Sequence, residues 1–165
     1  MEAPKKILVI DDDIDIIAVV ETILKNEGYE VIVANGKSEA IQKALQFKPD
    51  LALCDVMMSS QYEGFELTEE FKKNPELKKI PVLIHTSMQV FSSPDPDALS
   101  FARHYRTEMG GHDLDVMFVE STATGKSGID YKNEKGEIVW LPVDGFIRKP
   151  VKADNLLRKI KMLIK

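Results

Sequence analysis

Residues 7–13 of the chain read ILVIDDD, four apolar residues followed by three consecutive acids. A second run of this kind, LALCD at residues 51–55, ends in Asp55. Unbroken apolar runs of this length are typical of strands buried on both faces of a parallel sheet. If these two strands are neighbours, Asp11, Asp12 and Asp55 meet at one sheet edge, because parallel strands share the side of their carboxyl ends. Like charges repel there unless a cation lies among them.

Strand-like and helix-like segments alternate along the chain, which predicts βα units around a doubly wound parallel sheet. We expect strands at 6–10, 30–34, 51–54, 80–85 and 143–147, and helices at 13–28, from 38, at 64–74 and at 153–164. Two further polar residues stand at strand ends. Thr86 follows the fourth strand, and Lys149 follows the fifth. Ligands of such sheets bind outside the carboxyl ends of the strands.

The interval between Thr86 and Lys149 is too long for a simple connection. It holds 62 residues, whereas one helix with two short connections needs about 20. The pattern within it predicts a helix opening near Ser93-Pro94, a strand at 115–119, and a hairpin of 129–131 with 137–141, with Phe118, Tyr131 and Trp140 forming either a small core or a partner surface. We therefore expect one domain over residues 1–165 with an insertion at about 91–142, between the fourth and fifth strands.

The composition sets expectations for partners and compartment. A net charge of −5 argues against nucleic acid as the main partner. The single Cys54 lies inside an apolar run, which favours a reducing compartment. We see no signal peptide and no apolar stretch long enough for a membrane span. The sequence thus predicts a cytoplasmic protein without a membrane partner, either a monomer or a weak homodimer.

Four motifs, each at the end of a predicted strand, resemble the CheY-like receiver domain of two-component response regulators. They are ILVIDDD at 7–13, LCDVMM at 53–58, HTS at 85–87 and FIRKP at 146–150. The resemblance implies a (βα)5 flavodoxin-like fold and a stand-alone phosphorylation switch, which catalyses only its own phosphorylation and dephosphorylation. It also implies a sensor histidine kinase or phosphotransfer protein as the phosphoryl donor, and an unidentified downstream protein that binds one phosphorylation state.

The same resemblance implies a role for each site residue. Asp55 is the phosphoacceptor, and the Mg²⁺ ligands are Asp11 (through water), Asp12, Asp55 and the backbone carbonyl of Met57. Lys149 and Thr86 contact the phosphoryl group. Phe146 is the aromatic residue whose side chain moves with Thr86 when the domain is phosphorylated. Pro150 is a candidate for a cis peptide bond. His85 is expected to be a hydrogen-bonded strand residue, and Asp13 a helix cap.

Two alternatives remain open. In a haloacid-dehalogenase-like phosphohydrolase, Asp11 would be the nucleophile and Asp13 the acid/base, but Asp144 alone does not supply the late acidic pair that such a site needs for Mg²⁺. A degenerate receiver would bind its partners without phosphate. The family usually has a proline four residues after the phosphoacceptor, and this chain has Ser59 there, which keeps that second alternative open.

Overall fold

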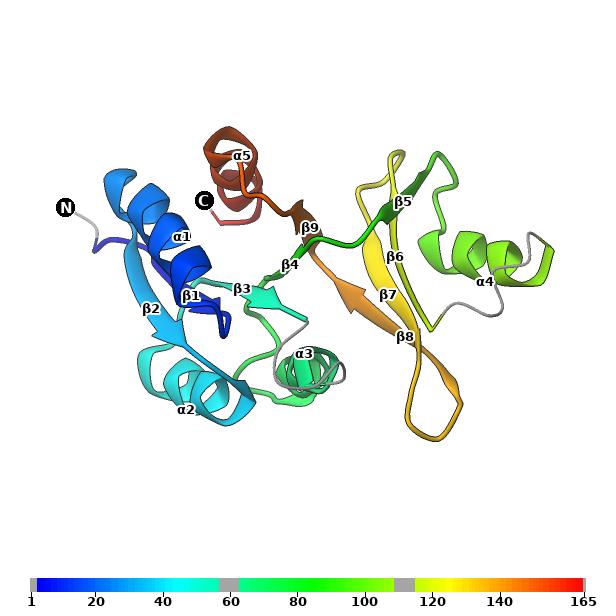
Figure 1. Ribbon diagram of the computed structural model, residues 1–165, viewed down its shortest axis with the longest axis horizontal. Helices are drawn as coiled ribbons and strands as arrows, with labels where there is room; N and C mark the ends of the chain where they lie inside the picture. The colour runs from blue at the N-terminus through cyan, green and yellow to red at the C-terminus, as the bar shows by residue number, and fades with distance from the viewer. Residues whose placement is uncertain (1–2, 57–62, 109–114, 165) are drawn as a thin grey trace. The chain divides into compact units, whose positions relative to one another are not determined.

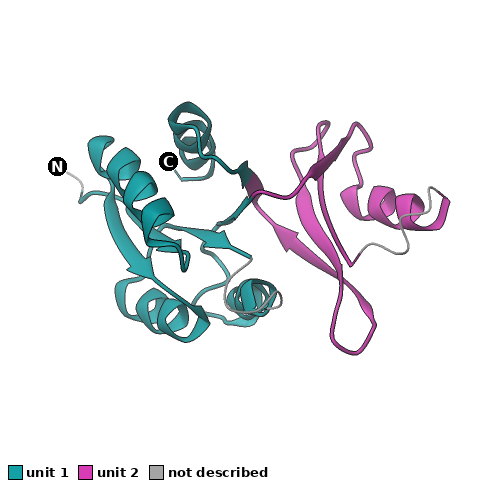
Figure 2. Cartoon of the chain, in the orientation of Figure 1, with its two compact units in different colours: residues 1–86, 147–165 teal, residues 87–146 magenta. Residues whose placement is uncertain are grey.

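The computed structural model describes residues 3–56, 63–108 and 115–164 (Figure 1). Met57, Met58 and Ser59, which the sequence analysis names, lie outside these ranges. The chain divides into two compact units, which Figure 2 colours separately. Unit 1 comprises residues 1–86 and 147–165, and unit 2 comprises residues 87–146. No helix in the described ranges is both long enough and apolar enough to cross a membrane.

Unit 1 is built on a five-stranded sheet with the strand order β2-β1-β3-β4-β9, in which β1 runs parallel to β2 and β3, and β3 runs parallel to β4. The strands are β1 (Lys6–Ile10), β2 (Glu30–Ala34), β3 (Leu51–Asp55), β4 (Val82–Thr86) and β9 (Gly145–Arg148), and the division between the units falls within β9, after Phe146. The helices are α1 (Ile14–Asn26), α2 (Lys37–Phe47), α3 (Glu63–Lys73) and α5 (Ala153–Leu163). This strand order is that of the flavodoxin-like fold, so the predicted fold class is confirmed.

Helices cover both faces of this sheet, α1 and α5 on one face and α2 and α3 on the other (Figure 1). The side chains of Ile7 and Val9 pack against residues of α1 and α5 in one core cluster. Their neighbours Leu8 and Ile10 point to the opposite face and are equally buried. Burial on both faces explains why the run at residues 7–10 is apolar without alternation. The Asp13 carboxylate caps α1, accepting hydrogen bonds from the next turn, as predicted.

Unit 2 holds a four-stranded sheet in the order β5-β6-β7-β8. Its elements are β5 (Val90–Ser93), α4 (Ala98–Glu108), β6 (Val116–Ser121), β7 (Ser127–Lys132) and β8 (Ile138–Val143). Strand β5 runs parallel to β6, whereas β7 runs antiparallel to both β6 and β8. The β7–β8 pair lies where the sequence indicates a hairpin, and Gly136 in its turn has a positive φ of 81°.

Two expected boundaries in this region are wrong. The strand expected at 143–147 is divided, because Val143 pairs with Ser127 as the last residue of β8, and β9 begins at Gly145. The helix expected to open near Ser93-Pro94 begins later. Ser93 is instead the end of β5, and pairs with a residue of β6. Strand β5 itself was not expected, because half of its four residues are serine and give a weak apolar signal.

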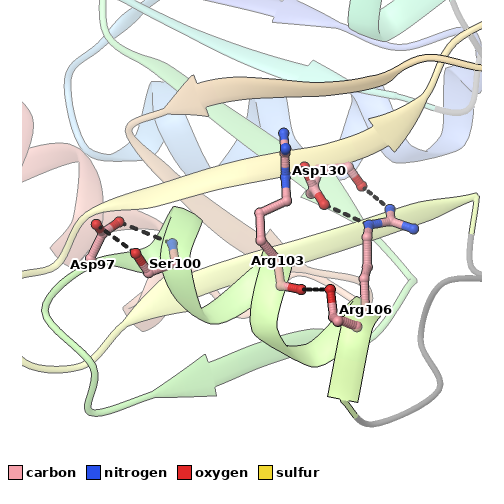
Figure 3. Close-up of polar contacts among 6 residues, drawn as sticks. Asp97, Ser100, Arg103, Arg106 and Asp130 are labelled. Carbon is pink, nitrogen blue, oxygen red and sulfur yellow. Dashed lines mark hydrogen bonds and ion pairs between the residues drawn. The ribbon is translucent and has the colours of Figure 1, made fainter.

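Helix α4 packs on one face of the unit 2 sheet. Ala98 and Ala102 contact Met117 and Val119 of β6, with Trp140 at the edge of the same cluster. Asp97 holds the start of the helix by accepting hydrogen bonds from both the backbone N–H and the hydroxyl of Ser100 (Figure 3). Near the other end, two arginines of α4 reach Asp130 on β7 (Figure 3). The helix is thus fixed to the sheet by apolar packing along its length and by an ion-pair network near its end.

Candidate functional site

Three carboxylates meet at the carboxyl edge of the unit 1 sheet. Strands β1 and β3 are paired so that Ile10 lies opposite Cys54, which brings the next residues, Asp11 and Asp55, to the same edge. One carboxylate oxygen from each of Asp11, Asp12 and Asp55 lies within 4.8 Å of the others. Asp11 and Asp55 are only 1% and 3% exposed, whereas Asp12 is exposed to solvent. The pairing predicted from the apolar runs therefore does gather these acids.

Lys149 bridges two of these acids. Its Nζ atom lies 3.4 Å from Asp11 Oδ2 and 3.5 Å from Asp55 Oδ1. The Lys149–Pro150 peptide bond is cis, at the position that the sequence analysis names as a candidate. The backbone N–H of Lys149 donates a hydrogen bond of 2.8 Å to the carbonyl oxygen of Thr86, so the buried Thr86 stands at the same sheet edge.

The charges of this pocket suit a hard divalent cation. Three carboxylates face one ammonium, which leaves an excess of negative charge where two of the acids are nearly removed from water. Asp11 Oδ1 already accepts a hydrogen bond of 2.9 Å from the backbone N–H of Asp13, which fixes the orientation of that carboxylate. Oxygen donors at this spacing are the ligands that Mg²⁺ prefers. The residues present therefore fit the ion, while the Met57 carbonyl lies outside the described ranges.

Phe146 belongs to unit 2 and is 2% exposed. Its ring lies 5.4 Å from the ring of Phe118 on β6, at an interplanar angle of 48°. Such tilted aromatic pairs are stabilising beyond their buried area. The residue named as a switch aromatic is thus part of the unit 2 core, only three residues before Lys149 in the chain.

His85 differs from what the sequence predicts. It lies on β4 opposite Asp55 and is 2% exposed, and its Nε2 atom has no hydrogen-bond partner among the described residues. Burial, together with the nearby charge of Lys149, lowers the pKa of His85 to about 4. The expectation of a hydrogen-bonded imidazole is wrong for Nε2, because β4 buries this nitrogen where no residue in the described part of the chain supplies a donor or acceptor for it.

Gly64, in the first turn of α3, lies against the backbone of Asp55 and Val56 and was not identified from the sequence. A Cβ atom there would lie 2.4 Å from the Cα atom of Val56 and 2.9 Å from the carbonyl oxygen of Asp55. Only glycine permits this approach of helix and strand end. A glycine early in a helix, shortly after a strand, is the signal that could have identified it.

Replacing Gly64 by alanine is expected to lower the free energy of unfolding of unit 1 by about 1–3 kcal/mol, because the added methyl group meets backbone atoms that cannot rotate away. Urea denaturation followed by far-UV circular dichroism measures this change. Gly36→Ala is the control, since a Cβ atom there meets only the side-chain end of Glu63 at 3.2 Å. Equal denaturation midpoints for the two variants would contradict the steric role of Gly64.

Comparisons with known proteins converge on one family. The sequence profile described as "Response regulator receiver domain" matches residues 7–94, more than half of the chain. The chain is 40% identical over 90 residues to the transcriptional regulatory protein ZraR of Klebsiella oxytoca, a match covering 54% of this chain and 19% of ZraR. It is 36% identical over 83 residues to the alkaline phosphatase synthesis transcriptional regulatory protein PhoP of Bacillus subtilis, covering 50% of this chain and 33% of PhoP.

Among solved structures, the chemotaxis protein CheY4 of Vibrio cholerae superimposes with a TM-score of 0.63 at 23% identity, over 98% of this chain and all of CheY4. At this identity the similarity supports the fold alone. The matches span a third or less of the length of ZraR and PhoP.

Proposed function

Because this chain belongs to the response regulator receiver domain family, we propose that it is a phosphorylation switch whose phosphoacceptor is Asp55. The observation that carries the proposal is the position of Lys149, whose ammonium contacts both Asp55 and Asp11 within one group of three carboxylates. Receiver domains are signalling switches rather than enzymes that turn over a separate substrate. We propose a sensor histidine kinase or phosphotransfer protein as the phosphoryl donor. We also propose that the protein acts in the cytoplasm, because its single cysteine is buried and unpaired, as is usual in a reducing compartment.

The acceptor step is a phosphoryl transfer. An oxygen of the Asp55 carboxylate attacks phosphorus and forms the new P–O bond, as the bond from phosphorus to the donor's histidine nitrogen breaks and its electron pair returns to that nitrogen. Lys149, 3.5 Å from Asp55 in the resting chain, is placed to pair with an oxygen of the transferred group. The Thr86 hydroxyl would donate to another phosphoryl oxygen. Asp12, Asp55 and the backbone carbonyl of Met57 would hold Mg²⁺ directly and Asp11 would hold it through water, and the ion would supply positive charge that offsets the repulsion between carboxylate and phosphate.

A change caused by phosphorylation would be transmitted to unit 2 through the two chain segments that connect it to unit 1. Unit 2 begins directly after Thr86 and ends at Phe146, and the backbone hydrogen bond from Lys149 to Thr86 ties the two joining segments together. A change at Thr86 or Lys149 is therefore close in the chain to the unit 2 core, where Phe146 packs on Phe118. We propose that residues 1–165 act as one receiver with unit 2 as its insertion, and that a downstream protein binds one phosphorylation state.

Incubation with acetyl phosphate and Mg²⁺, followed by intact mass measurement, tests the acceptor assignment. We expect the mass of one phosphoryl group to be added to the parent chain and none to be added to Asp55→Asn. Asp13→Asn is the matched control, because Asp13 is an exposed neighbouring acid that caps α1, and labelling should persist. Labelling that survives Asp55→Asn but is lost in Asp11→Asn would favour a phosphohydrolase. No labelling of the parent would favour a degenerate receiver.

A further inference from the structure

Unit 2 carries a second cluster of charged residues, remote in the sequence from the acids of unit 1. Asp130 on β7 is completely buried, and both of its carboxylate oxygens are used by arginines of α4. Arg106 Nε lies 2.6 Å from Oδ2, and Arg103 Nε lies 3.2 Å from Oδ1 (Figure 3). Arg106 Nη2 also donates to the Asp130 carbonyl oxygen at 2.9 Å. In these contacts, one buried carboxylate faces two guanidinium groups.

Arg103 is the more accessible of the two arginines. The Arg106 side chain is 6% exposed and committed to Asp130, whereas the Arg103 side chain is 46% exposed. Arg103 uses only its Nε atom for Asp130, and within the described ranges its two terminal nitrogens make no hydrogen bond or ion pair. A guanidinium held at Nε keeps a planar pair of N–H donors on its outer edge, which matches the two oxygens of a carboxylate or phosphate.

A hollow of about 460 Å³ adjoins these donors. Arg103, Arg106 and Thr107 of α4 line it, together with Ile138 at the start of β8. The Thr107 hydroxyl donates its hydrogen bond to the carbonyl oxygen of Arg103, so it lines the hollow but does not donate to a ligand. Ile138 supplies an apolar surface next to the charge. The hollow therefore combines the guanidinium group of Arg103 with a small apolar contact.

From this arrangement we propose that unit 2 binds an oxyanion, a carboxylate or a phosphate group, through the terminal nitrogens of Arg103. Asp130 and Arg106 act as positioning residues, because the buried ion pair holds α4 against β7 and Asp130 orients the Arg103 side chain at Nε. An acidic side chain or a phosphorylated residue of a partner protein would carry this group. The site does not depend on Asp55, so its test is independent of the phosphorylation switch.

Trp140 provides the readout. It is the only tryptophan of the chain, so its fluorescence reports on one place. It lies opposite Asp130 in the β7–β8 pair. Its side chain is on the same face of the sheet as that of Ile138, two residues before it. The full chain is titrated with sodium phosphate, with a short glutamate peptide, and with sodium chloride at equal ionic strength, while Trp140 fluorescence is recorded. Phosphate, the peptide or both should give a saturable change beyond that of chloride, and whichever binds identifies the source of the oxyanion.

Arg103→Gln should weaken that binding at least ~10-fold, the effect of losing a charge-assisted hydrogen bond, while Arg106 still neutralises Asp130. Lys135→Gln removes the same charge from the exposed turn between β7 and β8, and its affinity should equal that of the parent. A response no larger than that to chloride would overturn the proposal. So would an unchanged affinity in Arg103→Gln, or an equal loss in both variants, which would indicate general charge screening.

Discussion

Replacing Asp130 by asparagine is expected to lower the free energy of unfolding of unit 2 by about 3–5 kcal/mol, because it removes the negative charge that is paired with the buried guanidinium of Arg106. The side chains of Asp130 and Arg106 are 0% and 6% exposed, so water cannot take the place of the lost carboxylate. The amide keeps the size of the side chain and one acceptor oxygen, and the loss is therefore one of charge.

Urea denaturation followed by Trp140 fluorescence measures this loss, since the only tryptophan of the chain reports on unit 2. Arg103→Gln is the comparison, because it removes the exposed partner of Asp130 and leaves the buried pair intact. The cost of that variant should stay below about 1 kcal/mol, as for other exposed ion pairs. Equal costs for the two variants would show that the buried pair contributes no more than the exposed one.

Lowering the pH from about 6.5 to about 4 is expected to destabilise unit 1 through His85, by up to about 3 kcal/mol. The imidazole has a pKa of about 4 in the folded chain, against 6.5 for the unperturbed group. Between these values the unfolded chain binds a proton that the folded chain does not. The contribution of the uncharged His85 to the free energy of unfolding is therefore fully present above pH 6.5 and is lost as the pH falls toward 4.

Chemical denaturation of the parent and of His85→Leu across this pH range measures the effect. Carboxylates also titrate near its lower end, so the quantity of interest is the difference in pH dependence between the two proteins. His85→Leu should show a shallower dependence above pH 4. His104→Asn, a change at an exposed histidine of unit 2, should keep the slope of the parent. The same slope in His85→Leu and the parent would rule out His85 as the origin.

The strands of the parallel sheet and the acidic residues at their ends could be predicted because short stretches of sequence indicate them. A strand buried on both faces must be apolar throughout, and residues 7–10 and 51–54 satisfy this. Asp11 and Asp55 follow these runs directly, and parallel strands end on the same side, so the two acids had to share an edge. Helix caps such as Asp13 are equally local. For these features, the spacing of apolar and acidic residues in the sequence is enough to predict which side chains lie close together.

The contacts that set the details of each site depend on how separate elements pack against one another. Lys149 reaches Asp11 across 138 positions, and the approach of Gly64 to Val56 depends on how α3 packs against the end of β3. Whether a described residue bonds to His85 Nε2 depends likewise on neighbours in space rather than in sequence, and none does. In unit 2, neither arginine of α4 is marked by its surroundings in the sequence as a partner of Asp130 on β7. Periodicity reports which face of an element is buried, but side chains that meet across two elements leave no periodic trace, because their pairing arises only when the elements pack.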